Sequence, residues 1–170
     1  MNYFAYGSNM LTRRLTDWSR APSAVARGIA RAPGFVVRFH KVGADGSGKC
    51  TLVTTADLAA AAFGVLYEVA DADAESLDRA EGVHTGGYAR RAVKLELSAN
   101  RMVSAMTYVA GKRHVDASRV PFDWYRDLVV AGAIEHRLPP GYINELARVP
   151  AAADPDAARA ARARRLLDGS

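Results

Sequence analysis

Cysteine occurs once in this 170-residue sequence, at Cys50, so an internal disulfide and a Cys-rich zinc site are excluded. No run of apolar residues approaches the length of about 18 that a membrane-spanning helix needs. The residues after Met1 include no basic stretch and no apolar run of roughly 7 to 15 residues, so they do not resemble a signal peptide. The sequence therefore predicts a cytoplasmic protein without a membrane span.

The excess of charge of one sign is small. The chain has 23 basic and 18 acidic residues, which gives a net charge of +5. The basic residues are mostly arginines spread along the chain, and one cluster lies in an Ala-rich C-terminal segment: Arg159, Arg162, Arg164 and Arg165. Because no aromatic residue accompanies this cluster, the pattern disfavours a nucleic-acid partner.

The order of the expected elements indicates the fold class. With 49% hydrophobic residues, a chain of this length can bury one core as a single domain. Strands are predicted at residues 3–6, 23–30, 35–39, 50–55, 62–70, 88–97 and 102–109. Helices are predicted after residue 9, at 71–81, 121–135 and 141–147, and in the tail from residue 154. Because strands and helices do not alternate regularly, we expect an α+β fold on a mixed, possibly closed sheet.

Residues 43–49 read Gly-Ala-Asp-Gly-Ser-Gly-Lys, which partly matches a phosphate-binding P-loop. A P-loop leads into a helix, whereas the β-branched residues at 50–55 predict a strand. Cys50 also stands where a P-loop has the Ser or Thr that binds magnesium. We therefore interpret this segment as the turn of a β-hairpin.

The loop at residues 7–9 lies between the first strand and a helical pattern that extends to Trp18. Unpaired N–H groups at the start of a helix can bind an anion, and a glycine lets a ligand approach closely. Alternatively, Ser8 or Asn9 only caps the helix. The sequence leaves both interpretations open.

Glu81 breaks the apolar pattern of the helix predicted at residues 71–81. Ala74 and Leu77 begin the buried stripe, and the next position on that stripe is Glu81, just before Gly82. If the side chain is buried, its pKa should rise from about 4.3 toward roughly 6 or 7, which suits a general base. If the helix end frays, Glu81 is an ordinary solvated carboxylate.

Other catalytic patterns are missing. The four histidines, at positions 40, 84, 114 and 136, share no spacing typical of metal ligands, and no Gly-x-Ser-x-Gly motif occurs. Cys50 has no neighbouring base in the sequence. A metal site and a serine or cysteine acyl-enzyme are therefore disfavoured.

Three segments, in this order, resemble motifs of the γ-glutamylcyclotransferase (AIG2-like) family. They are residues 3–10, residues 77–83 with Gly87-Tyr88, and the pattern Gly132-Ala133-x-Glu135-x-x-Leu138-Pro139-x-x-Tyr142. The resemblance implies a small mixed β-barrel of about six to seven strands flanked by helices, with the site in a cavity at its mouth. It assigns residues 1–150 to the catalytic domain and leaves 151–170 as a tail, which we expect to be helical.

The resemblance also implies an activity: cyclisation of the γ-glutamyl group of a small-molecule substrate to 5-oxoproline, with release of the amine that it carried. This is an intramolecular aminoacyl transfer, and the family uses no metal or organic cofactor. By position, Glu81 matches the catalytic acid/base of the family. The residues that match its substrate-binding positions are Tyr6, Gly7, Ser8, Asn9 and Tyr108.

The leaving group is less clearly implied. The Tyr-Gly-Ser-Asn form resembles enzymes that act on γ-glutamyl amino acids or on γ-glutamyl-protected amines, whereas the glutathione-specific and γ-glutamylamine branches usually have leucine where Asn9 stands. The loops at residues 41–49 and 111–120 are expected to select the leaving group. An alternative function on the same fold is a non-catalytic module that binds a ligand or a protein.

Overall fold

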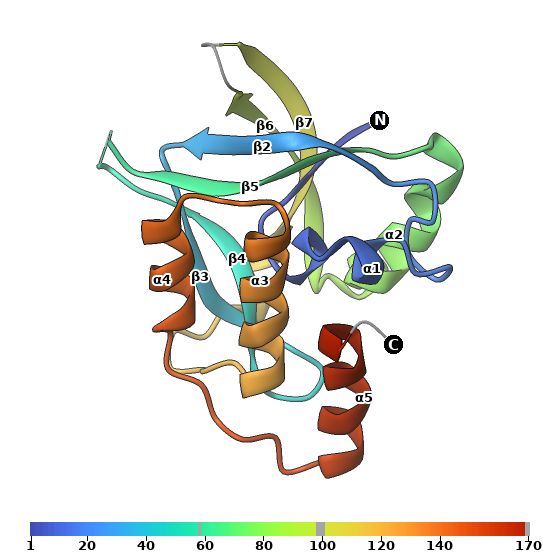
Figure 1. Ribbon diagram of the computed structural model, residues 1–170, viewed down its shortest axis with the longest axis vertical. Coiled ribbons are helices and arrows are strands. Elements are labelled where there is room, and N and C mark those ends of the chain that lie inside the picture. The colour runs from blue at the N-terminus through green and yellow to red at the C-terminus, as the bar shows by residue number, and fades with distance from the viewer. Residues whose placement is uncertain (58, 98–100, 169–170) are drawn as a thin grey trace.

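Five strands form a closed barrel in the order β1-β5-β2-β6-β7 (Figure 1). The computed structural model describes residues 1–57, 59–97 and 101–168. The barrel strands are β1 (Asn2–Ala5), β2 (Val25–Pro33), β5 (Ala61–Glu68), β6 (Tyr88–Glu96) and β7 (Met102–Ala110). Neighbouring strands are antiparallel, except that β1 and β7 meet in parallel at Tyr3 and Met106. The predicted mixed, closed sheet is confirmed.

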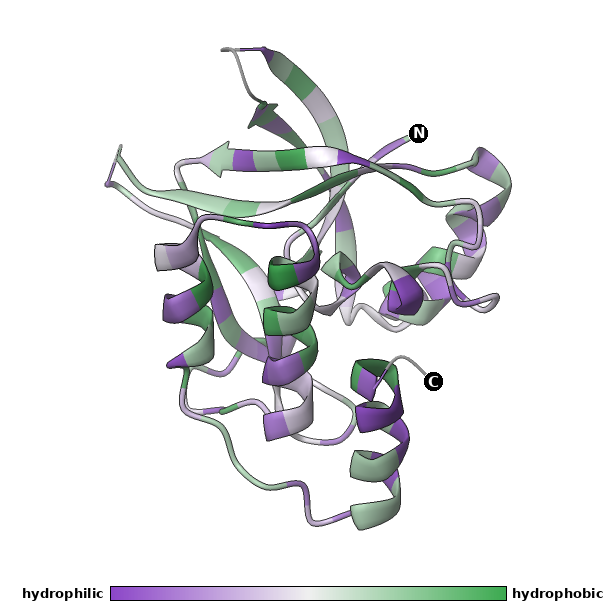
Figure 2. Ribbon diagram, in the orientation of Figure 1, coloured by the Kyte–Doolittle hydropathy of each residue, from purple (hydrophilic) through white to green (hydrophobic). Residues whose placement is uncertain are grey.

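Side chains alternate between the barrel interior and the surface. On β6, Val93 and Leu95 are buried and Lys94 between them is exposed. Phe4 on β1 and Tyr67 on β5 are completely buried. Figure 2 shows the resulting mixture of hydrophobic and hydrophilic positions along the strands. Each fully buried apolar side chain of this kind contributes about 1.5–3 kcal/mol to folding. These side chains belong to one continuous hydrophobic core. The turn predicted between β6 and β7, at 98–101, lies largely outside the described residues.

A separate two-stranded sheet stands beside the barrel. It consists of β3 (Phe35–Val42) and β4 (Gly48–Thr54), which pair in antiparallel. The hydroxyl of Thr51 accepts a hydrogen bond of 3.0 Å from the N–H of Ala110, which joins β4 to β7. The Gly-rich segment forms the turn between β3 and β4, so the hairpin interpretation is confirmed and the segment does not lead into a helix.

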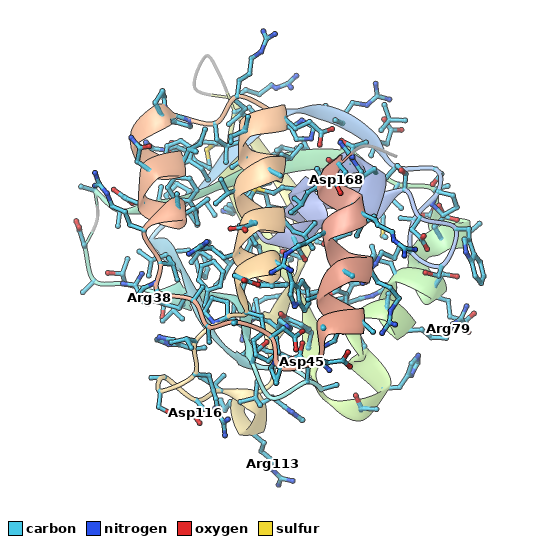
Figure 3. All side chains as sticks on the ribbon, turned by 60° about the horizontal axis from the view of Figure 1, so that its bottom comes forward. Arg38, Asp45, Arg79, Arg113, Asp116 and Asp168 are labelled. Atoms are coloured by element: carbon cyan, nitrogen blue, oxygen red, sulfur yellow. The ribbon has the colours of Figure 1, made fainter. Side chains whose placement is uncertain are left out.

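The helices at residues 74 and beyond follow the sequence pattern. They are α2 (Ala74–Glu81), α3 (Asp123–Glu135), α4 (Pro140–Ala147) and α5 (Ala157–Asp168), and α3 lies between α4 and α5 (Figure 1). Gly82 ends α2 with φ of 67°, a left-handed conformation that glycine adopts without steric cost. Arg79 extends outward from α2, and Arg113 and Asp116 extend from the loop after β7 (Figure 3). No helix in the described part of the chain is long and apolar enough to cross a membrane.

The first helix differs from the prediction. It has one turn, α1 (Thr12–Leu15), which follows a 3-10 segment at Ser8–Met10, and Trp18 is 85% exposed. Neither Ser8 nor Asn9 caps it through a side chain. The helix ends early because the Asp17 carboxylate accepts a bond of 2.9 Å from the N–H of Ser19, a local turn that competes with helical bonding.

The C-terminal tail is attached to α3. Ala160 on α5 is buried, and Arg164 pairs with Asp123 of α3 at 2.9 Å. The carboxylate of Asp154, ahead of α5, accepts a bond of 2.8 Å from the indole of Trp124. Asp154 also pairs with Arg159, so two of the four clustered arginines already have acidic partners.

Candidate active site

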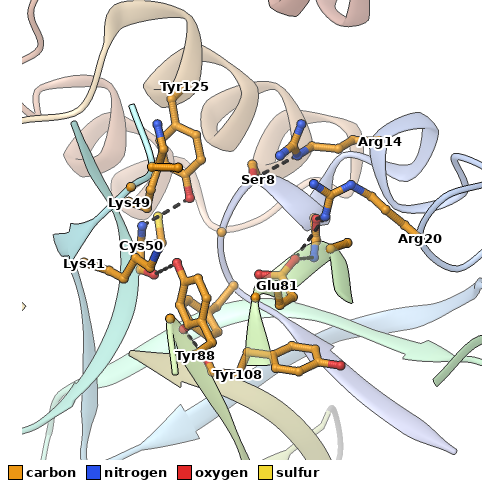
Figure 4. A pocket seen from close by; sticks show the side chains of 18 of the residues that line it. Ser8, Arg14, Arg20, Lys41, Lys49, Cys50, Glu81, Tyr88, Tyr108 and Tyr125 are labelled. Atoms are coloured by element: carbon orange, nitrogen blue, oxygen red, sulfur yellow. Dashed lines mark hydrogen bonds and ion pairs between the residues drawn. The ribbon is translucent and has the colours of Figure 1, made fainter. Parts of the chain in front are cut away.

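A cavity of about 310 Å³ opens where the loop after β1, the end of α2, β7 and the β3–β4 hairpin come together (Figure 4). All six site residues predicted from the sequence line it: Tyr6, Gly7, Ser8, Asn9, Glu81 and Tyr108. The structure therefore brings together in one cavity three segments that are distant in the sequence.

The side chain of Glu81 is only 15% exposed and points into this cavity. Of the two interpretations that the sequence left open, the solvated carboxylate is therefore wrong. Its Oε1 accepts hydrogen bonds from Asn9 Nδ2 at 2.9 Å and from Arg20 Nη1 at 3.0 Å. One carboxylate oxygen of Glu81 thus accepts from a charged donor and from an amide donor at once.

Arg20 is a site residue that the sequence analysis missed. Its side chain is 16% exposed, and its Nη1 also donates to Asn9 Oδ1 at 3.3 Å. Arg20 is 61 residues from Glu81 in the sequence and belongs to no recognised motif. The signal in the sequence that could have found it is Asp17 followed by Ser19, a pattern typical of a local turn. Arg20 directly follows this turn and lines the cavity.

The loop at residues 6–9 is fixed by close contacts on both sides. Gly7 passes β4 so closely that an added Cβ would lie 2.9 Å from the Cβ of Cys50, which excludes a larger residue without movement. The Tyr6 hydroxyl donates to the main-chain carbonyl of Tyr108 and ties the loop to β7. The second N–H of the Asn9 amide donates to the Tyr3 hydroxyl at 2.9 Å.

Helix α3 supports the residues just after this loop. A Cβ at Gly132 would lie 2.4 Å from the main-chain N of Leu11, so glycine allows the helix to contact the main chain there directly. The N–H of Thr12, the first residue of α1, donates to Glu135 Oε2 at 3.1 Å. The third sequence motif is therefore physically linked to the first, although it contributes no reacting group to the cavity.

Tyr108 is one of the residues that line the cavity, and its hydroxyl already has a partner. The hydroxyl donates to Asp78 Oδ1 at 2.7 Å, and Asp78 also pairs with Arg90 at 2.7 Å. Burial raises the pKa of Tyr108 well above its usual range, so the hydroxyl keeps its proton. Its role in substrate binding stays a prediction.

Another part of the cavity wall is formed by Cys50, Tyr88 and Tyr125. Tyr88 donates from its hydroxyl to the Cys50 carbonyl at 2.7 Å, and the Cys50 N–H donates to the Tyr125 hydroxyl at 3.1 Å. Burial raises the pKa of the Cys50 thiol to about 12. Because only the thiolate is a strong nucleophile, this environment suits a structural cysteine rather than a catalytic one.

Positive charge dominates the cavity. Its lining residues include Arg14, Arg20, Lys41 and Lys49, and Glu81 is the single acidic residue among the described residues that line it. The Nε of Arg14 donates to the Ser8 hydroxyl at 3.0 Å, and burial, followed by the neighbouring Arg20, lowers the pKa of Arg14 to about 10. A ligand that carries negative charge therefore fits this cavity best. Over residues 1–57, 59–97 and 101–168, no group of three or more potential metal ligands is found.

Comparisons with known proteins match the part of the chain that contains most of these site residues. The model of the AIG2-like family matches residues 61–146, which include Glu81, Tyr108 and Gly132. This chain belongs to the AIG2-like family. Among curated proteins, it is 29% identical over 151 residues to the γ-glutamylcyclotransferases of human and cattle, a match that covers 85% of this chain and 76% of each relative.

The AIG2-like fold also extends over most of the chain. A solved γ-glutamyl cyclotransferase matches with a TM-score of 0.78 and 26% identity, covering 89% of this chain and 88% of that structure. A Bacillus subtilis protein, YkqA, matches with a TM-score of 0.69 at 20% identity. The α+β barrel flanked by helices that the sequence resemblance implied is thus confirmed.

Proposed function

We propose that this AIG2-like protein is a γ-glutamylcyclotransferase that converts the γ-glutamyl group of an amino acid or amine conjugate into 5-oxoproline and releases the amine. The observation that carries the proposal is the position of Glu81. A partly buried carboxylate lies beside a loop with main-chain N–H groups in a cavity of about 310 Å³, in a family whose relatives have this name.

In the proposed reaction, the α-nitrogen of the substrate attacks its own γ-carbonyl carbon. A C–N bond forms to close the five-membered ring, and the C–N bond to the leaving group breaks. The α-ammonium loses two protons during this change, and the leaving nitrogen gains two on departure as an ammonium. The Glu81 carboxylate carries these protons one at a time, so protons and charges balance without a covalent enzyme intermediate.

The loop at residues 7–9 has a second role in this proposal. The first N–H groups of the helical segment at Ser8–Met10 have no carbonyl partner within that segment. They are suited to hold the α-carboxylate or the oxyanion that develops on the γ-carbonyl. Holding one flexible molecule in its ring-closing shape also makes the attack more probable, because both reacting groups belong to that molecule.

The deciding experiment is to incubate the purified protein with γ-glutamyl-alanine and measure 5-oxoproline. Replacement of Glu81 by Gln should lower the rate by about 10²- to 10⁴-fold, because the amide cannot accept the proton. Glu75→Gln is the matched control, since Glu75 lies on the same helix with a side chain that is 76% exposed. Activity that survives in Glu81→Gln contradicts the assignment of the base.

The same variant separates catalysis from the alternative, a module that only binds. Calorimetric binding of γ-glutamyl-alanine without 5-oxoproline from either wild type or Glu81→Gln would favour the binding module. We expect instead that Glu81→Gln binds the substrate and fails to convert it, because the loop and the cations of the cavity are unchanged.

A further inference from the structure

The β3–β4 hairpin presents two lysines to the cavity from directly paired positions, Lys41 and Lys49. Lys49 has its partners: Nζ pairs with Asp45 at 2.8 Å and lies 4.7 Å from the ring centre of Trp124. Lys41 lies 5.1 Å from the ring centre of Tyr88, and no carboxylate of the described residues lies within 4 Å of its Nζ. One lysine is thus neutralised and the other is not.

The backbone explains why Lys41 faces the cavity. The β3–β4 register shifts between Arg38 and Lys41, which is the position of a β-bulge. Bulges redirect side chains and are frequent beside active sites. Cross-strand partners project on the same face of a sheet, so Lys41 and Lys49 both line the cavity. Lys41 also pairs through its backbone with Val115, in the loop after β7.

The ammonium of Lys41 is partly withdrawn from water without a contacting anion. Burial lowers the pKa of Lys41, although the more distant Glu81 and Asp45 oppose that effect. Asp45 is already engaged by Lys49. An unpaired cation in such an environment gains most from a ligand carboxylate, because a charge-assisted hydrogen bond replaces the lost hydration.

The charges of the substrate can be assigned to the two sides of the cavity. Glu81 needs the α-ammonium as its proton donor. Arg14 and Ser8 are joined by a hydrogen bond on one side of the cavity, whereas Lys41 enters from β3 beside the ring of Tyr88 (Figure 4). The α-carboxylate of the γ-glutamyl group therefore belongs with Arg14 and the loop. Lys41 is left facing the space that the leaving group occupies.

We propose that Lys41 selects the leaving group by binding its carboxylate, so that the enzyme acts on γ-glutamyl amino acids in preference to γ-glutamyl conjugates of amines without a carboxylate. This inference rests on the proposed cyclotransferase function and adds a specificity residue to it. Glu81 and the loop act on the γ-glutamyl group that all such substrates share, whereas Lys41 contacts the part that differs between them.

The test compares γ-glutamyl-alanine with γ-glutamyl-alaninamide, which has a neutral amide in place of the leaving-group carboxylate. The kcat/KM of each is measured from 5-oxoproline formation in wild type, Lys41→Met, Lys41→Arg and Lys94→Met. Lys94 is an exposed lysine of β6 outside the cavity, so Lys94→Met is the matched control. Both compounds are assayed on one preparation, so the ratio of their kcat/KM values is independent of the folded fraction.

Wild type should prefer the acid by about 10- to 100-fold, the usual effect of a hydrogen bond between charged groups. Lys41→Met should lose most of this preference, mainly through a lower kcat/KM for γ-glutamyl-alanine, whereas Lys41→Arg and Lys94→Met should keep it. A ratio in Lys41→Met within about twofold of the wild-type ratio overturns the role of Lys41 and leaves the cyclotransferase intact. Absence of 5-oxoproline from both compounds with wild type overturns the proposed function itself.

Discussion

Asn9 and Glu81 are 72 residues apart in the sequence and are joined by a hydrogen bond of 2.9 Å from Nδ2 to Oε1. The other N–H of the Asn9 amide donates to Tyr3, and its oxygen accepts from Arg20. Each polar function of the amide thus has a partner. Asn9 therefore acts as a positioning residue that holds the carboxylate against the loop.

Asn9→Ala should lower kcat/KM by about 10- to 100-fold, because the Glu81 carboxylate loses one of its two hydrogen bonds and a fixed orientation. The fall should appear mainly in kcat, since the loop N–H groups to which we assign substrate binding remain. Asn144→Ala, on the exposed face of α4, is the control. Kinetics indistinguishable from wild type would show that the carboxylate needs no support from this amide.

Arg20→Met should lower kcat/KM by about 10- to 100-fold, because the Glu81 carboxylate loses a charge-assisted hydrogen bond of 3.0 Å that fixes its orientation in the cavity. The kcat/KM is measured from 5-oxoproline formation, with exposed Arg148→Met as control. A kcat/KM equal to that of the wild type contradicts this role.

Gly132→Ala should destabilise the protein by about 1–3 kcal/mol and reduce its activity, because the added methyl group overlaps the main chain at Leu11. Urea unfolding and 5-oxoproline formation measure the two effects. Gly141→Ala is a matched helical control, since nothing lies within 4 Å of its Cβ position. Equal stability of the two variants would contradict the close contact between α3 and the main chain at Leu11.

Cys50 should resist alkylation. Because burial raises the pKa of its thiol to about 12, iodoacetamide at pH 8 should leave the native protein unlabelled and should label it fully in urea. Mass spectrometry counts the added groups. Fast labelling of the native protein, or loss of activity in step with labelling, would argue for a reactive thiol in the cavity wall.

Asp154→Asn should destabilise the protein in a pH-dependent way. The guanidinium of Arg159, with the indole N–H of Trp124, holds the pKa of Asp154 well below its usual range. The stabilisation from a lowered pKa is fully present above the usual value of about 3.9 and is lost as the pH falls through the lower native value. Unfolding in urea should therefore separate the variant from wild type more clearly at pH 6 than at pH 3. An equal difference at both pH values would contradict the ionic contribution.

The sequence predicted the elements whose pattern is local. Alternation predicted the strands, and the spacing from Ala74 through Leu77 correctly placed Glu81 on the inward side of α2. The family resemblance then brought Glu81 and the loop at residues 7–9 to one cavity, which no periodicity could do.

The parts that the sequence did not predict depend on long-range contacts or on single turns. Arg20 reaches Glu81 because the Asp17 turn shortens α1, and the predicted helix to Trp18 overlooked that turn. Lys41 faces the cavity because of one extra residue in β3, and a bulge leaves little trace in an alternating pattern. Arg20 belonged to no recognised motif, and Lys41 was singled out only as one end of the loop at residues 41–49 that was expected to select the leaving group.

The parallel contact between β1 and β7 has a consequence for the order of folding. The Thr107 hydroxyl donates to the Phe4 carbonyl at 2.8 Å across 103 residues, so the barrel closes only when the first and last strands meet. Such distant pairing slows folding, because the entropy of a long chain must be lost before the contact forms. During synthesis, β1 therefore lacks one neighbouring strand until β7 has left the ribosome, and the loop at residues 6–9 that follows β1 takes its final place late in folding.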